Sequence, residues 1–185
     1  MIGAKDLKPG LVVMYKGQLH EVVEAQFYKP CKGGSIMRMK FRNIKSGNVT
    51  PDTLRGDDTI EQVYLDQEDM QYLYKDDHGY CFMNQTTYEQ IHVSEETLGD
   101  KSLYLKEGMV VTVKMHDHEV LGVEPPIHVV LQIAETEPGF RGNTVSGATK
   151  PAKMETGVIV KVPLFIEQGE YIKVDTRTGT YIERA

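Results

Sequence analysis

The chain has 185 residues, of which 40% are hydrophobic and 26% charged, ordinary values for a soluble globular protein. The first residues hold no apolar signal-peptide core, no apolar run is long enough to cross a membrane, and two cysteines are too few for a disulfide scaffold. We therefore expect a cytoplasmic protein without a membrane segment. The net charge of −6 argues at first against a nucleic-acid partner.

The charge is divided unevenly along the chain. Residues 1–63 carry ten Lys or Arg and seven Asp or Glu, residues 64–140 carry four and fifteen, and residues 141–185 carry seven and five. A basic, an acidic and a mildly basic part thus share one chain, which indicates different partners for different parts. Because residues 1–63 are basic, a nucleic-acid partner for this part is again a reasonable hypothesis.

The pattern predicts β-strands throughout. Apolar stretches are short, rich in Val, Ile and Tyr, and bounded by Gly, Asp, Asn or Pro. The one helix we expect is short, around residues 94–98, with Ser94 as its N-cap and Gly99 as its end. Strands do not alternate with helices, which disfavours a parallel sheet.

A weak internal repeat predicts modules. Residues 7–13 are echoed at 105–111 and, more loosely, at 157–163. Each copy has a turn glycine, enters a β-rich stretch, and is expected to reach a hairpin turn. The three expected hairpin turns are residues 16–17, 116–118 and 168–169. Module boundaries are predicted near Tyr64 and near residues 125–127; neither is a flexible Gly/Ser linker.

The most informative segment is residues 27–35, which joins two strand-like stretches. In the second stretch, period-two alternation predicts Met37, Met39 and Phe41 inward. The same alternation predicts an outward basic row, which consists of Arg38, Lys40 and Arg42. Residues 29–45 hold six positive charges and no acid. Such a row can track RNA phosphates, although a solvated hairpin with scattered lysines fits the pattern too. Phe27 and Tyr28 are the nearest aromatic stacking candidates.

The loop tip is built for close approach to a partner. Pro30 stiffens its entry, and Gly33 and Gly34 permit tight backbone geometry. Lys32 is then a compact positive charge with three donors on a flexible stem. Such a side chain can enter a crevice that a whole domain cannot.

The tip, Lys29-Pro30-Cys31-Lys32-Gly33-Gly34, resembles the K-P-G-K-G-x tip of the elongation factor P family. Other matching segments run essentially end to end: residues 80–84, 88–90, 147–152, 155–157, 162–166 and 169–177. The resemblance implies an all-β fold of three small barrels. An SH3-like (KOW-like) domain at 1–64 would be followed by OB-type domains at 65–126, which is acidic, and at 127–185, in an L-shaped, tRNA-like arrangement.

The resemblance also implies a function. The chain would be a bacterial translation elongation factor, not an enzyme, and would need no cofactor or metal. It would bind the ribosome between the P and E sites, beside the peptidyl-tRNA, as a monomer. It would stimulate peptide-bond formation, above all at consecutive prolines, with Lys32 positioning the tRNA 3′ end. In many members a modifying enzyme lengthens the tip lysine.

Further roles follow from the same resemblance. Residues Gly142, Asn143 and Thr144 match a loop near mRNA in the E site. Tyr181 and Arg184 match a C-terminal pair at the small-subunit end of the tRNA. The acidic middle part is either a solvated face or a surface for a basic ribosomal protein.

Two residues depart from the family pattern. Cys31 replaces a glycine, which would add strain of about 1–2 kcal/mol if that position needs φ > 0, and otherwise indicates a turn that accepts cysteine. Asn143 replaces an aspartate, which keeps the turn preference but removes a charge beside RNA. Recognition by a modifying enzyme and contact with the codon are the properties these changes affect.

Other interpretations of these residues carry less weight. His116 and His118 lack the further ligands a zinc site needs, and Cys31 lacks a partner base for nucleophilic catalysis, although its thiol could be oxidised. Cys81 either packs or faces outward, and Tyr88 is expected to pack rather than to stack on RNA. A divergent paralogue within the family and a general OB-fold RNA-binding protein remain the alternatives.

Overall fold

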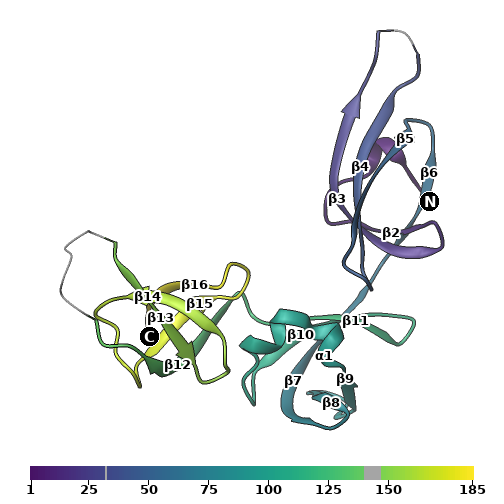
Figure 1. The fold of residues 1–185 in the computed structure, drawn as a ribbon. Helices are drawn as coiled ribbons and strands as arrows, with labels where there is room; N and C mark the ends of the chain where they lie inside the picture. The colour runs from purple at the N-terminus through teal and green to yellow at the C-terminus, as the bar shows by residue number, and fades with distance from the viewer. Residues whose placement is uncertain (32, 140–146) are drawn as a thin grey trace. The chain divides into compact units, whose positions relative to one another are not determined.

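A computed structural model describes residues 1–31, 33–139 and 147–185, and in these ranges the chain is nearly all β (Figure 1). The described residues fall into two compact units. One consists of Met1–Asp66 with Met115–Leu121, and the other of Gln67–Lys114 with Gly122–Ala185. No helix within the described ranges is long and apolar enough to span a membrane.

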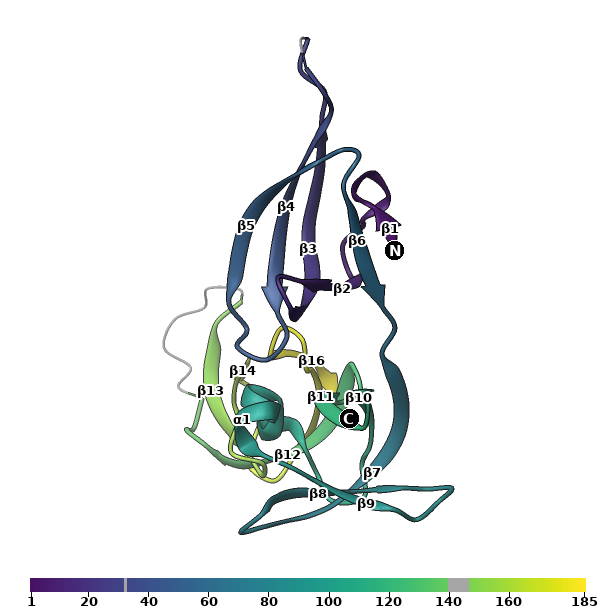
Figure 2. The ribbon, with the colours of Figure 1, turned by 90° about the vertical axis from the view of Figure 1, so that its right-hand side faces the viewer.

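The first sheet is antiparallel and has the strand order β1-β6-β2-β3-β4-β5. Its elements are β1 (Ile2–Gly3), the 3-10 helix η1 (Ala4–Asp6), β2 (Val12–Tyr15), β3 (Gln18–Tyr28), β4 (Ile36–Asn43), β5 (Val49–Arg55) and β6 (Thr59–Val63). Strands β3 and β4 are the longest of this sheet and form a hairpin arm that is paired as far as Tyr28 and Ile36 (Figure 2).

The core of this sheet confirms the predicted alternation in β4. Met37, Met39 and Phe41 are at most 3% exposed, while the residues between them are exposed. They pack with Val13 and Val22 of β2 and β3. The buried face therefore fixes which side chains β4 presents outward.

The second sheet has the order β11-β10-β7-β8-β9. Its elements are β7 (Asp66–Asp76), β8 (Gly79–Asn84), β9 (Gln90–Val93), α1 (Glu95–Leu98), the 3-10 helix η2 (Gly99–Tyr104), β10 (Val110–His116) and β11 (Glu119–Glu124). The predicted helix is confirmed: Ser94 Oγ accepts from the Thr97 N–H at 3.3 Å, and Gly99 ends α1 at φ 55°. The 3-10 helices were not predicted.

The third sheet has the order β14-β13-β12-β15-β16. Its strands are β12 (His128–Thr136), β13 (Thr149–Met154), β14 (Ile159–Pro163), β15 (Tyr171–Asp175) and β16 (Thr180–Arg184). Read from its β16 edge, this sheet has the same strand order as the second sheet read from β11. The two sheets therefore share one topology, built twice along the chain.

The internal repeat is real, but one of its three copies was misplaced. Gly10 and Gly108 each donate a backbone N–H, at 2.8 Å, to Val22 and Tyr72 of a neighbouring strand. In the third sheet the equivalent donor is Gly169, whose N–H reaches the Ile133 carbonyl at 2.9 Å. The third copy thus precedes β15, where residues 167–170 form the turn.

The prediction of a third copy at 157–163 was therefore wrong, whereas the turn predicted at 168–169 is present and lies before β15. Gly157 instead closes the hairpin of β13 and β14, donating to the Met154 carbonyl at 2.9 Å. Both kinds of turn place a positive-φ glycine before a β-rich stretch, so composition alone does not separate them.

Candidate nucleic-acid interface

The outer face of the arm is set by the pairing of β3 with β4. Arg42 lies opposite Glu21, Lys40 opposite Glu24, and Arg38 opposite Gln26. An irregularity between Val22 and Glu24 keeps both glutamates on this face. The basic row predicted from β4 is exposed as expected.

The row is not uniformly charged, because β3 neutralises part of it. Lys40 Nζ lies 2.5 Å from Glu24 Oε2, and an Arg42 guanidinium nitrogen lies 3.3 Å from Glu21 Oε2. The guanidinium of Arg38 instead lies over the Tyr28 ring, 5.3 Å from its centroid. Sequence reasoning missed these partners, because it considered β4 without the register of β3.

The tip is open to a partner along most of its length. Lys29, Cys31, Gly33 and Gly34 are exposed and Pro30 is half-buried, whereas Lys32 lies outside the described residues. Gly33 adopts φ 111°, a conformation that favours glycine. Cys31 is not among the described residues with positive φ, so cysteine is accommodated here without left-handed strain.

The C-terminal residues singled out by the resemblance lie on β16. Tyr181 is half-buried and packs against the core of the third sheet. Arg184 is exposed, and its guanidinium lies 2.7 Å from Glu170 Oε1 and 5.8 Å from the centroid of the Phe165 ring. Gly142, Asn143 and Thr144 lie outside the described residues.

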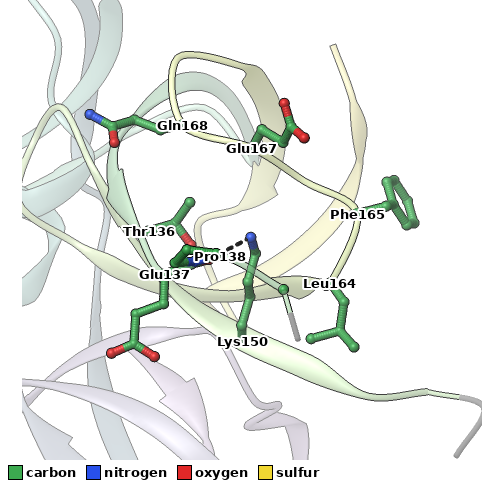
Figure 3. Close-up of a pocket in the computed structure, with 9 residues that line it drawn as sticks. Thr136, Glu137, Pro138, Lys150, Leu164, Phe165, Glu167 and Gln168 are labelled. Carbon is green, nitrogen blue, oxygen red and sulfur yellow. Dashed lines mark hydrogen bonds between the residues drawn. The ribbon is translucent and has the colours of Figure 1, made fainter. Parts of the chain in front are cut away.

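A pocket of about 770 Å³ opens beside Phe165 (Figure 3). Lys150 of β13 points into it and is only 7% exposed, and its Nζ donates to the Glu137 carbonyl at 2.8 Å. Gly139 lines the pocket too, so close to Leu164 that a Cβ there would meet the Leu164 carbonyl oxygen at 2.5 Å. The sequence offered no signal for this burial beyond the position of Lys150 in a resembling segment.

A cluster of hydrogen-bonded side chains lies at the β2–β3 hairpin. Lys16 Nζ lies 2.9 Å from Asp52 Oδ2, and the Tyr15 hydroxyl donates to the same oxygen. These two hydrogen bonds, that of Tyr15 first, lower the pKa of Asp52 to about 2. Tyr15 is itself stacked on Phe41, with ring centroids 4.4 Å apart. The cluster ties the turn to the core and keeps the Asp52 charge compensated.

The structure also shows how far Cys81 and Tyr88, two residues outside the interface, are exposed. Cys81 is fully buried, and its thiol lies 3.8 Å from Gln90 Oε1. Tyr88, expected to pack, is 71% exposed with φ 61°, so that expectation was wrong. The reason is the Asn84 side chain, which accepts two backbone N–H groups and closes a tight turn that turns Tyr88 outward. Within the described residues no group of three His, Cys, Asp or Glu side chains could hold a metal.

Comparison with known proteins decides the family. Residues 3–60 match the Elongation factor P (EF-P) KOW-like domain, residues 65–123 the Elongation factor P (EF-P) OB domain, and residues 129–184 Elongation factor P, C-terminal. The chain belongs to the elongation factor P family. It is therefore a translation elongation factor, in a family of translation factors rather than enzymes.

Curated relatives agree with this assignment, and a solved structure has a similar fold. The chain is 45% identical over 184 residues to elongation factor P of Coprothermobacter proteolyticus, covering 100% of this chain and 99% of the relative. It is 47% identical to elongation factor P of Caldicellulosiruptor bescii, covering 100% of each. Its fold resembles a structure described as eukaryotic translation initiation factor 5A from Methanococcus jannaschii, with a TM-score of 0.55, 22% identity, and coverage of 67% of this chain and 90% of that one.

Proposed function

We propose that this factor binds the ribosome between the P and E sites and stimulates peptide-bond formation, especially at consecutive prolines. The observation that carries the proposal is the β3–β4 arm. Its tip, Lys29 to Gly34, resembles the family motif except at Cys31, has a lysine at position 32, and is exposed at Lys29, Cys31, Gly33 and Gly34. Lys32 would hold the 3′ end of the P-site tRNA in a reactive pose.

The proposed mechanism is positional. Proline reacts slowly because its ring restricts the chain and its nitrogen is a secondary amine. A group that fixes the tRNA 3′ end lowers the entropic part of the barrier, and it needs only hydrogen-bond donors for backbone oxygens or phosphates. Neither an acid nor a base is required from the tip, so the factor assists the ribosome's own reaction.

The remaining roles are proposed on the same basis. Gly142, Asn143 and Thr144 would contact mRNA in the E site, while Tyr181 and Arg184 would contact the small-subunit end of the tRNA. A lysine-modifying enzyme would act on Lys32, and the acidic domain would face a basic ribosomal protein. We propose domains at 1–64, 65–126 and 127–185, acting as a monomer in the cytoplasm.

The test is the rate of Pro-Pro-Pro synthesis in a reconstituted translation system. Three conditions are compared: no factor, protein purified from its native host, and Lys32→Ala. We expect the intact protein to accelerate the reaction and the alanine variant to be inactive. No acceleration by the native protein would contradict the proposal and favour a divergent paralogue or a general RNA-binding protein.

A further inference from the structure

Tyr28 and Arg38 form an aromatic–guanidinium pair on β3 and β4, next to the tip. Half of Tyr28 is exposed, at 50%, although it lies at the end of a paired strand. The guanidinium of Arg38 lies over its ring, 5.3 Å from the centroid, within the range of a cation–π contact. An exposed aromatic ring held by a guanidinium is a surface on which a nucleobase can stack.

Arg38 also differs from its neighbours because no acidic side chain faces it on β3. Lys40 and Arg42 each face a glutamate, while Arg38 faces the neutral Gln26. Among the described residues no carboxylate lies within 4.0 Å of the Arg38 guanidinium, and the segments outside them contain no Asp or Glu. Its donors are therefore available for a phosphate, which guanidinium groups bind in a forked geometry.

A groove next to Arg38 gives room for such a group. It has a volume of about 420 Å³ and is lined by Gln26, Arg38 and Thr53, among others. Two acids also line it, and both are compensated. Glu24 is paired with Lys40, and Asp52 with Lys16. The groove therefore carries the uncompensated positive charge of Arg38, together with neutral hydrogen-bonding side chains.

We propose that Tyr28 and Arg38 bind one unpaired RNA nucleotide, with the base stacked on Tyr28 and the phosphate held by Arg38 in the groove. This inference rests on the proposed function, in which the neighbouring tip reaches the tRNA 3′ end. In this proposal Arg38 alone holds a phosphate, and the basic row as a whole does not. Lys40 and Arg42 then serve to hold β3 against β4.

The first experiment measures the affinity of the full chain for ribosomes carrying a P-site tRNA, at several salt concentrations. We expect Arg38→Gln to weaken binding about ten-fold and to reduce the salt slope by about one. Lys8→Gln removes the same charge from an exposed turn, and this control should stay within about two-fold of the intact protein.

Two substitutions of Tyr28 test the stacking part of the site. Tyr28→Leu should weaken binding about ten-fold, because stacking of one base on an aromatic ring is lost, whereas Tyr28→Phe keeps the ring and the affinity. Phe27→Leu removes a neighbouring aromatic ring that is 57% exposed and lies in no cation–π contact in the described structure, so it should have little effect.

A second measurement separates this inference from the proposed function. A free single-stranded RNA hexanucleotide is titrated into the full chain, and the ring resonances of Tyr28 are followed by NMR. We expect them to shift in the intact protein and not in Arg38→Gln. Failure of the intact protein to bind ribosomes, with the Tyr28 shifts retained, would contradict the proposed function alone. Intact ribosome binding with Arg38→Gln equal to Lys8→Gln would overturn the nucleotide site.

Discussion

The Tyr104 hydroxyl lies 3.0 Å from the position that a Cβ on Gly179 would occupy. Tyr104 ends the 3-10 helix η2, which follows α1, yet it is only 9% exposed and belongs to the core of the third sheet. Gly179, in the turn between β15 and β16, adopts φ 67°. The two residues show how the third sheet is joined to the chain before it: a residue of η2, between β9 and β10 in the sequence, supplies part of the third sheet's core.

This arrangement makes Tyr104 a stability determinant. Tyr104→Ala should lower the free energy of unfolding by roughly 2–4 kcal/mol, because it removes a buried aromatic ring and leaves a cavity. Urea unfolding followed by circular dichroism measures the change. Tyr88→Ala is the control, expected within about 0.5 kcal/mol since Tyr88 is exposed. Equal effects of the two changes would contradict the shared core.

The Asp52 cluster predicts a defined pH dependence. The folded-state pKa of Asp52, about 2, lies below its ordinary value of 3.8, so its contribution to stability is present above about pH 4 and is lost as the pH falls toward 2. Asp52→Asn should cost about 1–2 kcal/mol at pH 7, after allowance for partial exposure, and nothing near pH 2. Unfolding measured at both pH values tests this. Asp57→Asn, at an exposed surface ion pair, should have little effect at either pH.

Lys150 should stabilise the end of β12. Lys150→Met removes the charged hydrogen bond to the Glu137 carbonyl and should cost about 1–3 kcal/mol. Lys153→Met changes an exposed lysine on the same strand and should remain within about 0.5 kcal/mol. Thermal or urea unfolding of both variants measures the difference. If the two were indistinguishable, the buried ammonium would have no structural role.

The two adjacent tip glycines should respond differently to alanine. Gly33→Ala forces a side chain into φ 111° and should cost about 1 kcal/mol. Gly34 lies outside the positive-φ region and a Cβ there would meet nothing within 4 Å, so Gly34→Ala should be neutral or stabilising by about 0.4–1 kcal/mol. Cys31→Ala should also be close to neutral. Unfolding midpoints of the three variants decide this, and a stability loss in Gly34→Ala equal to that in Gly33→Ala would be inconsistent with the tip geometry.

Sequence reasoning performed well wherever a local rule was sufficient. Alternation in β4 predicted the buried Met37, Met39 and Phe41, since side chains of a strand point to opposite faces. Ser94 and Gly99 predicted a four-residue helix through their capping chemistry. The family resemblance also came from contiguous segments, which are read without knowledge of the fold.

It failed where partners are distant in the chain. The third copy of the repeat was placed at Gly157 instead of Gly169, because Gly169 donates the deciding hydrogen bond to the carbonyl of Ile133, a residue of another strand. The exposure of Tyr88 was missed for a local reason: the Asn84 side chain closes the turn by accepting the N–H groups of Thr86 and Thr87, and composition does not specify that contact.

By itself, therefore, the sequence determined the β architecture, the family and the exposed basic face of the arm, since each follows from local pattern or contiguous motif. Only the tertiary structure decided which of those basic residues has no acidic partner among the described residues. Strand register brings Glu21 to Arg42 and Glu24 to Lys40 and leaves Arg38 with Gln26 and the Tyr28 ring. Electrostatic pairing depends on distances of a few ångströms between strands, and that spacing is set by the pairing of the folded sheet.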